Sequence, residues 1–232
     1  MEVKAAVARI AGGDFTLEQL TLSDMRADEV LVRIVATGLC HTDIVVRDQL
    51  LPTPLPAVLG HEGAGIVEAV GADVTTLMPG DRVVMGFAAC RECPQCVAGH
   101  PAYCRDFSAL NFGGCRADGS TCLHDGVAPV SSHFFGQSSF ASHAIAAAHN
   151  LVKVPAEAPL ELLGPLGCGI MTGAGAVMKA LKLQAGETIL ITGGGPVGLS
   201  AVIAAKASGA GQIIVADPLA TRRAMALDLG AT

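Results

Sequence analysis

The sequence predicts a mixed α/β protein in which a β-rich N-terminal part precedes the first strands of a doubly wound parallel sheet. In the first ninety residues, short apolar runs alternate with turn-forming residues, a pattern typical of antiparallel β-structure. After about residue 170 the order becomes strand, glycine turn, helix, strand and helix, which is how a doubly wound sheet begins. We therefore expect two domains, spanning residues 1–170 and 171–232.

The N-terminal domain is expected to consist mainly of strands. Val30, Val32 and Ile34 alternate with residues of the opposite face, as in a strand with one buried side. The same kind of pattern predicts further strands at 64–70, 81–85, 139–148 and 150–154. A short helix is expected over 41–49. Residues 90–135 are rich in Cys, Gly, Pro, Ser and Asn and predict an irregular lobe, which needs a cross-link because long structureless loops are uncommon in compact domains.

The C-terminal domain is expected to contain two parallel strands and two helices. Runs of β-branched residues at 187–192 and 212–217 predict the strands, and helical spacing predicts helices over 199–210 and 220–230. Two parallel strands cannot bury both faces of a sheet, and its open edge tends to aggregate unless it is covered. We therefore expect this domain to be incomplete in the 232-residue chain.

Composition and charge narrow the functional classes. Apolar residues make up 51% of the chain and charged residues 16%, which excludes a disordered protein. The net charge is −6 and no cluster of Lys or Arg occurs, which argues against nucleic acid and anionic membranes as partners. No apolar run has the length of a membrane span and no signal-peptide pattern opens the chain, so we expect a cytoplasmic protein.

Four of the eight cysteines follow one another closely, with two, two and seven residues between Cys90, Cys93, Cys96 and Cys104. Four thiolates on one loop complete the tetrahedral shell of a structural zinc, which would hold the lobe together over residues 88–106. An iron–sulfur cluster is the alternative, but its bacterial motif continues after three residues to Cys-Pro. A zinc-stabilised nucleic-acid-binding module is a second alternative, against which the acidic net charge counts. The spacing favours zinc.

Three further candidate metal ligands, Cys40, His61 and Cys168, are dispersed along the chain. Two thiolates and one imidazole leave the fourth position of a zinc ion open for water or substrate. Each residue by itself is a weak indication, because a single cysteine is more often a small buried apolar residue. Spacing alone does not join them, and Cys115 and Cys122 fit neither set.

Gly193, Gly195 and Gly198 form the pattern G-x-G-x-x-G between a predicted strand and a predicted helix. Such glycines let the backbone approach a pyrophosphate at the helix N-terminus. Asp217 ends the next strand, where a carboxylate accepts hydrogen bonds from the adenosine ribose and repels the 2′-phosphate of NADP. Arg222 and Arg223 are the opposing indication, which would favour NADP, so these residues alone leave the choice of coenzyme open.

These motifs together resemble the zinc-dependent medium-chain alcohol dehydrogenases. The resemblance covers essentially the whole chain in order, through GLCHTD (38–43), GHEGAGIVEAVG (60–71), PGDRV (79–83), the four-cysteine lobe, HFFGQSSFA (133–141), GCGIMTGAGAV (167–177) and GGGPVGLS (193–200). LNFGG (110–114), ADGS (117–120) and HFFGQSSFA further resemble the aryl-alcohol (benzyl alcohol) branch. The resemblance implies a GroES-like catalytic domain followed by the first part of a Rossmann dinucleotide-binding domain, truncated at its C-terminal side.

By this resemblance, Cys40, His61 and Cys168 are the ligands of a catalytic zinc. Asp43 is the carboxylate that orients the zinc-bound imidazole. Glu62 is the buried acid behind the metal that approaches it during ligand exchange.

The resemblance also implies a route for the proton. Thr42 lies beside the alcohol oxygen and begins a relay through the nicotinamide ribose. The best-known family members end that relay with a histidine three residues later, where this chain has Val45. His41 stands where many relatives have an arginine that contacts the pyrophosphate, so we hypothesise that His41 serves as both phosphate contact and relay base.

The remaining implied site residues hold the coenzyme and the substrate. Seven positions correspond to coenzyme contacts in the family: Gly193, Gly195, Val197, Gly198, Asp217, Arg222 and Thr172. Gly86 and Phe87 stand where family members line the substrate pocket, and Phe134 stands on its other wall. A glycine leaves space for a ring and a phenylalanine offers an apolar face, so aryl and allylic primary alcohols are the expected substrates.

The resemblance therefore implies reversible oxidation of small primary alcohols to aldehydes with NAD, two zinc ions per chain (one catalytic, one structural) and homo-oligomers among full-length relatives. Formaldehyde as its glutathione adduct and other primary aliphatic alcohols stay open as substrates, as does a non-catalytic zinc-binding fragment. We expect the 232-residue chain alone to keep zinc but to show negligible turnover and weak NAD affinity. Hydride transfer needs both reactants held about 3–3.5 Å apart in a water-poor site.

Overall fold

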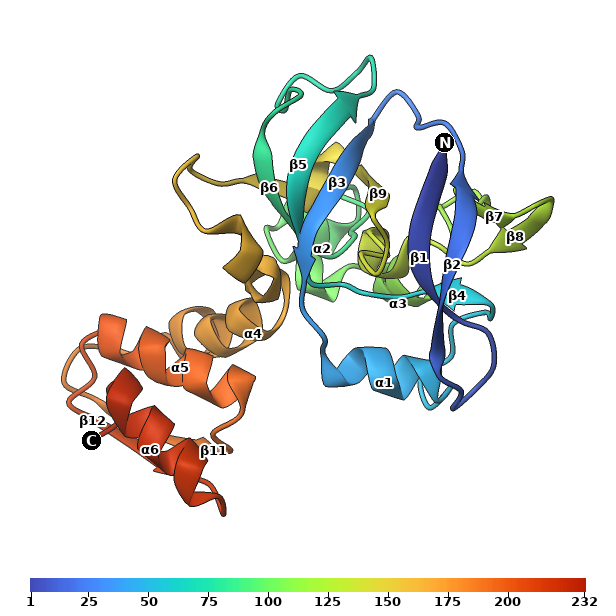
Figure 1. Cartoon of the computed structure of the whole chain (residues 1–232). Coiled ribbons are helices and arrows are strands. Elements are labelled where there is room, and N and C mark those ends of the chain that lie inside the picture. The colour runs from blue at the N-terminus through green and yellow to red at the C-terminus, as the bar shows by residue number, and fades with distance from the viewer. The chain divides into compact units, whose positions relative to one another are not determined.

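The computed structural model describes all 232 residues and divides the chain into two compact units, Met1–Gly167 and Cys168–Thr232. Figure 1 shows strands and short helices in the first unit and helices beside a small sheet in the second. Each unit has hydrophobic core clusters of its own. The mixed α/β class that the sequence predicts is confirmed. No helix combines the length and the apolar character needed to cross a membrane.

The first unit contains two five-stranded antiparallel sheets. Across the first sheet the strands lie in the order β4 (Ala57–Val58), β1 (Glu2–Ala8), β2 (Phe15–Leu22), β7 (Leu123–Asp125) and β8 (Ala128–Val130). Across the second sheet they lie in the order β10 (Leu151–Lys153), β6 (Arg82–Met85), β5 (Gly63–Val70), β3 (Glu29–Thr37) and β9 (His143–Ala147).

Strand β3 shows why the sequence pattern predicted this sheet. Val30 and Val32 are completely buried and pack with Val67 of β5, whereas Arg33 is exposed. The pairing of β3 with β5 shifts register twice, and such bulges bend a strand and increase its twist. The sheet therefore curls, as in a GroES-like fold.

Short helical segments connect the strands of the first unit. The α-helices are α1 (His41–Arg47), α2 (Pro94–Val97) and α3 (Phe107–Phe112). The 3₁₀ turns are η1 (Pro101–Tyr103), η2 (Phe134–Gly136), η3 (Ala148–Asn150), η4 (Leu160–Leu162) and η5 (Gly164–Gly167). The expectation of an irregular lobe over 90–135 is therefore corrected: α2, α3 and the hairpin β7–β8 lie within it. These elements have six residues or fewer, too few for a periodic pattern to show in the sequence.

The second unit contains a two-stranded parallel sheet with three helices. Its elements are α4 (Gly169–Gly175), the π-helical turn η6 (Ala176–Leu181), β11 (Thr188–Thr192), α5 (Pro196–Ala207), β12 (Gln212–Ala216) and α6 (Ala220–Leu229). Ile189 and Ile191 of β11 are buried with Val202 of α5, whereas Leu190 between them is 62% exposed. One face of this sheet is therefore covered and the other is open.

Helix α4 was not expected, because its sequence GIMTGAG is rich in glycine and lacks helical patterning. The packing of α4 on α5 explains it. A Cβ at Gly173 would lie 2.1 Å from the carbonyl oxygen of Val197, so only glycine permits this approach of the two helices. Tertiary packing thus outweighs the low helix propensity of this segment.

A buried ion cluster joins β3 of the first unit to the lobe. The Glu29 carboxylate, 4% exposed, accepts hydrogen bonds from Nε (2.6 Å) and Nη2 (2.8 Å) of Arg116 and from the backbone N–H of Arg26 (2.8 Å). Burial alone would raise the pKa of Glu29. The contacts with His133, Arg116 and the Arg26 amide outweigh burial and hold that pKa well below its usual range.

His133 completes this cluster. Its Nε2 lies 3.6 Å from Oε1 of Glu29, and its Nδ1 lies 2.9 Å from Oγ of Ser132. Burial by itself would lower the pKa of His133. The contacts with the Cys122 sulfur and the Glu29 carboxylate outweigh burial and raise the pKa to about 9. The imidazole is therefore charged at neutral pH in the folded chain.

We expect the free energy of unfolding to decrease as the pH rises from 6.5 to about 9. The raised pKa of His133 contributes stability that is fully present below the unfolded value and is lost as the pH passes the folded value. The change should be roughly 1–3 kcal/mol, at about 1.4 kcal/mol per pKa unit. Urea unfolding at about pH 6, 8 and 10 measures it.

His133→Asn is the matched variant, because asparagine tolerates the left-handed backbone (φ +63°) at this position. The cysteines outside this cluster affect both chains alike, so the difference between the two pH profiles isolates the imidazole together with its contact to Cys122. Parallel pH profiles for the two chains would contradict this assignment.

Candidate metal centres and dinucleotide turn

The four cysteines of the lobe come together in the first unit. The sulfur atoms of Cys90, Cys93, Cys96 and Cys104 all lie within 4.8 Å of one another. Zinc–sulfur bonds of about 2.3 Å place tetrahedral ligands about 3.8 Å apart. The measured separation between the sulfurs of Cys90 and Cys96 is 3.9 Å. The arrangement therefore fits a four-thiolate zinc site.

Backbone N–H groups donate hydrogen bonds to these sulfurs and so stabilise negative charge on them. The N–H groups of Arg105 and Cys93 donate to the sulfurs of Cys93 (3.5 Å) and Cys90 (3.3 Å), respectively. Amides of Arg105 and Cys96 lower the pKa of Cys93 to about 6, whereas burial and the neighbouring thiols raise the pKa of Cys96 to about 12. Without a cation, the negative charge of the first thiolate opposes ionisation of the neighbouring thiols. A divalent metal removes this repulsion.

A second group brings together residues that are far apart in the sequence. The ligand atoms of Cys40, His61, Glu62 and Cys168 lie within 4.8 Å of one another. Cys40 precedes α1, and the His61–Glu62 pair precedes β5. Cys168 directly follows Gly167, where a Cβ would lie 2.1 Å from the carbonyl oxygen of Met85 on β6. This close approach to β6 fixes the position of Gly167, the residue before Cys168.

Asp43 of α1 organises this group from a completely buried position. One carboxylate oxygen accepts a hydrogen bond from the backbone N–H of Cys40 (2.9 Å). The other accepts from the N–H of Gly60 (3.0 Å) and lies 3.0 Å from Nδ1 of His61. A single carboxylate therefore links the two segments that carry Cys40 and His61.

His61 directs its other ring nitrogen at the group. Nε2 is buried and has no hydrogen-bond partner. Burial lowers the pKa of His61, but Asp43 and Cys40 raise it to about 9, so a metal must displace a proton to bind there. Phe135 stacks on the imidazole at 4.6 Å between ring centroids, and Phe134 meets it edge-on at 5.4 Å. The orphaned nitrogen fits a metal ligand.

The other expected catalytic residues lie at or beside this group. The hydroxyl of Thr42 is 3.6 Å from the sulfur of Cys40. Glu62 is 5% exposed, and its carboxylate packs so closely on Gly38 that a Cβ there would lie 1.9 Å from Oε2. His41 is the exposed first residue of α1.

The residues expected to line the substrate pocket differ in how deeply they are buried and in the space around them. Phe134 is 1% exposed and packs in a core cluster with Val46 and Leu59, so its ring supports His61 rather than facing a pocket. Gly86 has only the carbonyl oxygen of Asn150, at 3.5 Å, near the position of a Cβ. Phe87, Phe107 and Phe135 are partly buried, with ring centroids 5.6 Å (87–107) and 6.3 Å (107–135) apart.

The glycine turn joins β11 to α5 within the second unit. Gly193 has a φ of +94°, which favours glycine. A Cβ at Gly198 would lie 1.8 Å from the carbonyl oxygen of Gly193, so the turn closes only with glycine there. A Cβ at Gly195 would meet nothing within 4 Å. This third glycine leaves open space at the N-terminus of α5.

Asp217 follows β12 and holds this turn in place. Its carboxylate accepts hydrogen bonds from the N–H groups of Leu219 (2.8 Å) and Gly194 (2.8 Å), which lower its pKa. The side chain is 2% exposed, and the half-exposed Arg222 lies 3.6 Å from it. Asp217 is thus mainly a support of the turn in this structure.

The last two expected coenzyme residues also lie in the second unit. Val197, in the first turn of α5, is 46% exposed. Thr172 lies on α4, next to Gly173, which contacts the carbonyl of Val197. Thr172 is therefore close to the glycine turn.

A family model described as the alcohol dehydrogenase GroES-like domain matches residues 26–156, more than half of the chain. The chain belongs to the zinc-type alcohol dehydrogenase family. Geraniol dehydrogenase of Castellaniella defragrans is 53% identical over 233 residues, covering 100% of this chain and 62% of that protein. The chain thus spans about three fifths of the length of this relative.

Solved structures agree with this family. A zinc-binding alcohol dehydrogenase domain protein from Burkholderia ambifaria has a TM-score of 0.98 at 59% identity. Benzyl alcohol dehydrogenase from Acinetobacter calcoaceticus has a TM-score of 0.96 at 50% identity. Each alignment covers 100% of this chain and 63% of the other.

Phe135 lies on His61 and Phe107 lies beside Phe135, but the sequence analysis assigned neither residue to the candidate site. Phe135 has a left-handed φ of +50°, which turns its ring onto His61. A left-handed backbone conformation at a phenylalanine cannot be predicted from the residue pattern. The only available indication is that five of the seven phenylalanines fall within residues 87–135.

We expect Cys96→Ser to remove about one zinc ion per chain and to destabilise the lobe, because the binding energy of a structural zinc is also folding energy. Cys115→Ser is the matched control, since Cys115 is a free thiol outside both groups. Elemental analysis and thermal unfolding of the purified variants measure the two effects. Equal zinc content in the two variants would refute the assignment.

Proposed function

We propose that the whole protein oxidises primary aryl or allylic alcohols to aldehydes, with a catalytic zinc held by Cys40, His61 and Cys168 and with NAD as hydride acceptor. The observation that carries this proposal is the buried, unpartnered Nε2 of His61 beside two cysteine sulfurs. A nitrogen and two thiols are the ligands of an open zinc site, and four clustered thiols are those of a closed one. The chain thus offers two zinc sites with different roles.

When bound, zinc lowers the pKa of an alcohol oxygen and NAD accepts a hydride. Asp43 prepares His61 for the metal, because its carboxylate retains the proton on Nδ1 and leaves the Nε2 lone pair free to bind. The backbone bonds of Asp43 to Cys40 and Gly60 fix the spacing of the ligands. The carboxylate of Glu62 lies within 4.8 Å of the other three ligand atoms, close enough to take part in ligand exchange.

We assign the proton transfer to Thr42 and His41. Oγ1 of Thr42, next to the Cys40 sulfur, is placed to relay the proton of the substrate hydroxyl, accepting that proton as it releases its own to a neighbouring base. His41 is the adjacent residue, is exposed, and can pass a proton to solvent. This pair would replace the longer relay of relatives that have a histidine where this chain has Val45.

The second unit supports the coenzyme part of the proposal. Gly193 and Gly195, where a Cβ would meet nothing within 4 Å, leave the N-terminus of α5 free for a pyrophosphate, whose charge suits the helix dipole. Asp217 has acceptor positions beyond its two backbone bonds, and its charge disfavours a 2′-phosphate. We therefore propose that this unit is the first part of an NAD-binding domain.

The aromatic residues support the substrate class. Phe135 on His61, with Phe107 and Phe87 beyond it, gives an apolar aromatic wall near the metal group. The relatives named geraniol dehydrogenase and benzyl alcohol dehydrogenase indicate allylic and benzylic alcohols, in which the hydroxyl-bearing carbon adjoins an unsaturated carbon. A ring or alkene against this wall would add apolar burial that ethanol lacks.

In the full-length enzyme, we expect kcat/KM for benzyl alcohol and geraniol to exceed that for ethanol by about 100-fold, equivalent to about 2.7 kcal/mol of apolar and aromatic contact. Phe135→Ala should reduce this ratio by about tenfold, and Phe135→Leu should reduce it less because an apolar side chain remains. The ratio cancels any general loss of activity. Equal kcat/KM for ethanol and benzyl alcohol in the unmodified enzyme would contradict the substrate class.

Gly195→Ala should weaken NAD binding by about tenfold or more without lowering the melting temperature, because its Cβ meets only open space in the protein. Gly198→Ala is the contrasting variant, and should destabilise the second unit because its Cβ would strike a carbonyl oxygen. Calorimetric titration of NAD into the full-length protein and thermal unfolding separate the two effects. If Gly195→Ala binds NAD normally, the pyrophosphate does not approach this turn.

A further inference from the structure

The strained segment, residues 133–138, combines several unfavourable backbone conformations. Left-handed φ angles occur at His133 (+63°), Phe135 (+50°), Gly136 (+69°) and Ser138 (+52°), and only one of these residues is a glycine. Non-glycine residues in this region are unfavourable and persist only where the surrounding structure holds them. Contacts with the rest of the first unit must therefore keep the strained segment in this conformation.

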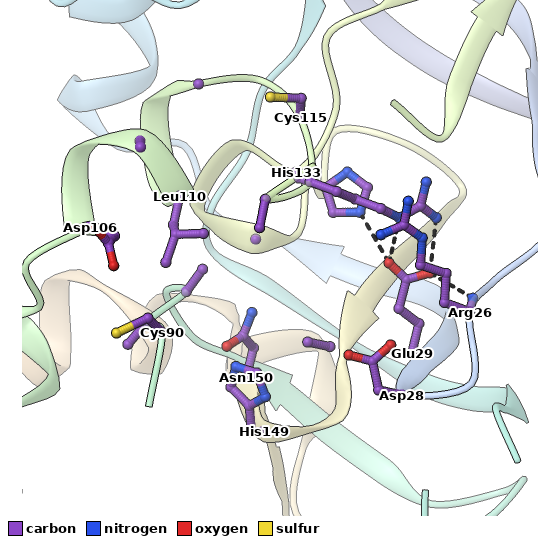
Figure 2. Close-up of a pocket in the computed structure, with 18 of the residues that line it drawn as sticks. Arg26, Asp28, Glu29, Cys90, Asp106, Leu110, Cys115, His133, His149 and Asn150 are labelled. Atoms are coloured by element: carbon purple, nitrogen blue, oxygen red, sulfur yellow. Dashed lines mark hydrogen bonds and ion pairs between the residues drawn. The ribbon is translucent and has the colours of Figure 1, made fainter. Parts of the chain in front are cut away.

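Most polar contacts of the strained segment go to residues outside the candidate metal group. Figure 2 shows the ring of His133 beside the Glu29 carboxylate, with Nε2 3.6 Å from Oε1. Gly136 packs on Asn150, where a Cβ would lie 2.5 Å from Nδ2. The hydroxyl of Ser138 donates to the carbonyl oxygen of Val58 at 2.6 Å. These contacts account for the strain without involving a metal ligand.

Gln137 differs from its neighbours, because its side chain bonds to the backbone of a candidate metal ligand. The residue is 1% exposed. Its Oε1 accepts a hydrogen bond from the N–H of Gly63 (2.9 Å), and its Nε2 donates to the carbonyl oxygens of His61 (3.0 Å) and Gly86 (3.3 Å). The reversed amide would set its oxygen against both carbonyls, so these partners fix the orientation of the side chain.

The Gln137 amide takes the place of strand pairing between two segments. Strands β5 and β6 pair from Ala64 and Val84 onward, and this pairing does not extend to His61 and Gly86. The side-chain amide lies between these two residues and bonds to both carbonyls, as a peptide group of an intervening strand would. It therefore ties the backbone of His61 to the chain that leaves the end of β6.

Asp43 and Gln137 hold different parts of His61. The Asp43 carboxylate lies 3.0 Å from Nδ1 of the ring, whereas Gln137 bonds to the main-chain carbonyl. Phe135, two residues before Gln137, stacks on the same imidazole at 4.6 Å between ring centroids. The ring, its stacking partner and the backbone of His61 are thus fixed together, which sets the direction of the unpartnered Nε2.

We propose that Gln137 is a positioning residue of the candidate metal group, because its amide holds the backbone of His61 against the end of β6 and so keeps Nε2 directed at the metal. Gln137 acts through His61 and contacts neither metal nor substrate. The proposal rests on the assignment of Cys40, His61 and Cys168 as a zinc site. Residues that orient metal ligands typically change metal affinity by about 10–100-fold when they are replaced.

The test measures the release of zinc from the zinc-loaded full-length protein to a chromogenic chelator. Release should occur in two phases, one for each zinc site, and Cys96→Ser identifies the phase of the His61 group because that variant lacks the zinc of the lobe. Gln137→Met keeps the length of the side chain and removes its three hydrogen bonds. We expect it to accelerate the phase of the His61 group by about tenfold and to leave the phase of the lobe unchanged.

Ser139→Ala is the matched control. Ser139 is completely buried, and its hydroxyl pairs with that of Thr37 at 2.8 Å, so the variant loses a buried hydrogen bond without losing a bond to His61 or Gly86. Both release phases should stay unchanged in Ser139→Ala even though its melting temperature decreases. If Gln137→Met does not fold, Gln137→Asn makes the same test, because its amide is one methylene too short to reach all three partners.

The outcomes separate this proposal from the one on which it rests. Two zinc ions in the unmodified protein, with the same release rates in the Gln137 variant, would overturn the role of Gln137 alone. Equal acceleration of both phases would do the same, because it would show general destabilisation. A single zinc ion in the unmodified protein would overturn the assignment of the His61 group and the role of Gln137 with it.

Discussion

The hydrogen bonds of the Asp43 carboxylate are the constraint on which the arrangement of Cys40 and His61 depends. This buried side chain bonds to the Cys40 amide, the Gly60 amide and the His61 ring, and so joins α1 to the segment before β5. A buried carboxylate is costly unless its oxygens are hydrogen-bonded, and here every bond goes to the segments that carry the candidate metal ligands. Stability and ligand placement thus depend on the same few bonds.

Close backbone contacts at glycines also fix the positions of the segments around the candidate sites. Gly38 leaves room for the Glu62 carboxylate, and Gly167 lets the chain pass the end of β6 just before Cys168. In the second unit, Gly198 closes the turn and Gly173 brings α4 onto α5. The glycines that the sequence analysis associated with coenzyme binding therefore have unequal roles: Gly198 is needed by the fold, whereas Gly195 leaves space that the fold does not use.

The sequence predicted most of the regular structure, because β3 and β11 alternate buried and exposed residues as a half-buried strand must. It also predicted the group of Cys90, Cys93, Cys96 and Cys104, since these ligands lie on one short segment. Helix α4 and the ring of Phe135 depend on tertiary packing and on a left-handed backbone, which local pattern does not encode. Their functional roles, like those of Asp217 and Thr42, stay predictions.

Zinc K-edge X-ray absorption on the purified, zinc-loaded protein tests the two-site account most directly. One closed site of four sulfurs and one open site of two sulfurs, a histidine nitrogen and an exchangeable oxygen average to about three sulfurs near 2.3 Å and about one nitrogen or oxygen near 2.0 Å per zinc. That average is the predicted result. A shell of four sulfurs with no lighter ligand would show that zinc occupies only the lobe, and would contradict the assignment of His61 and its neighbours as a metal site.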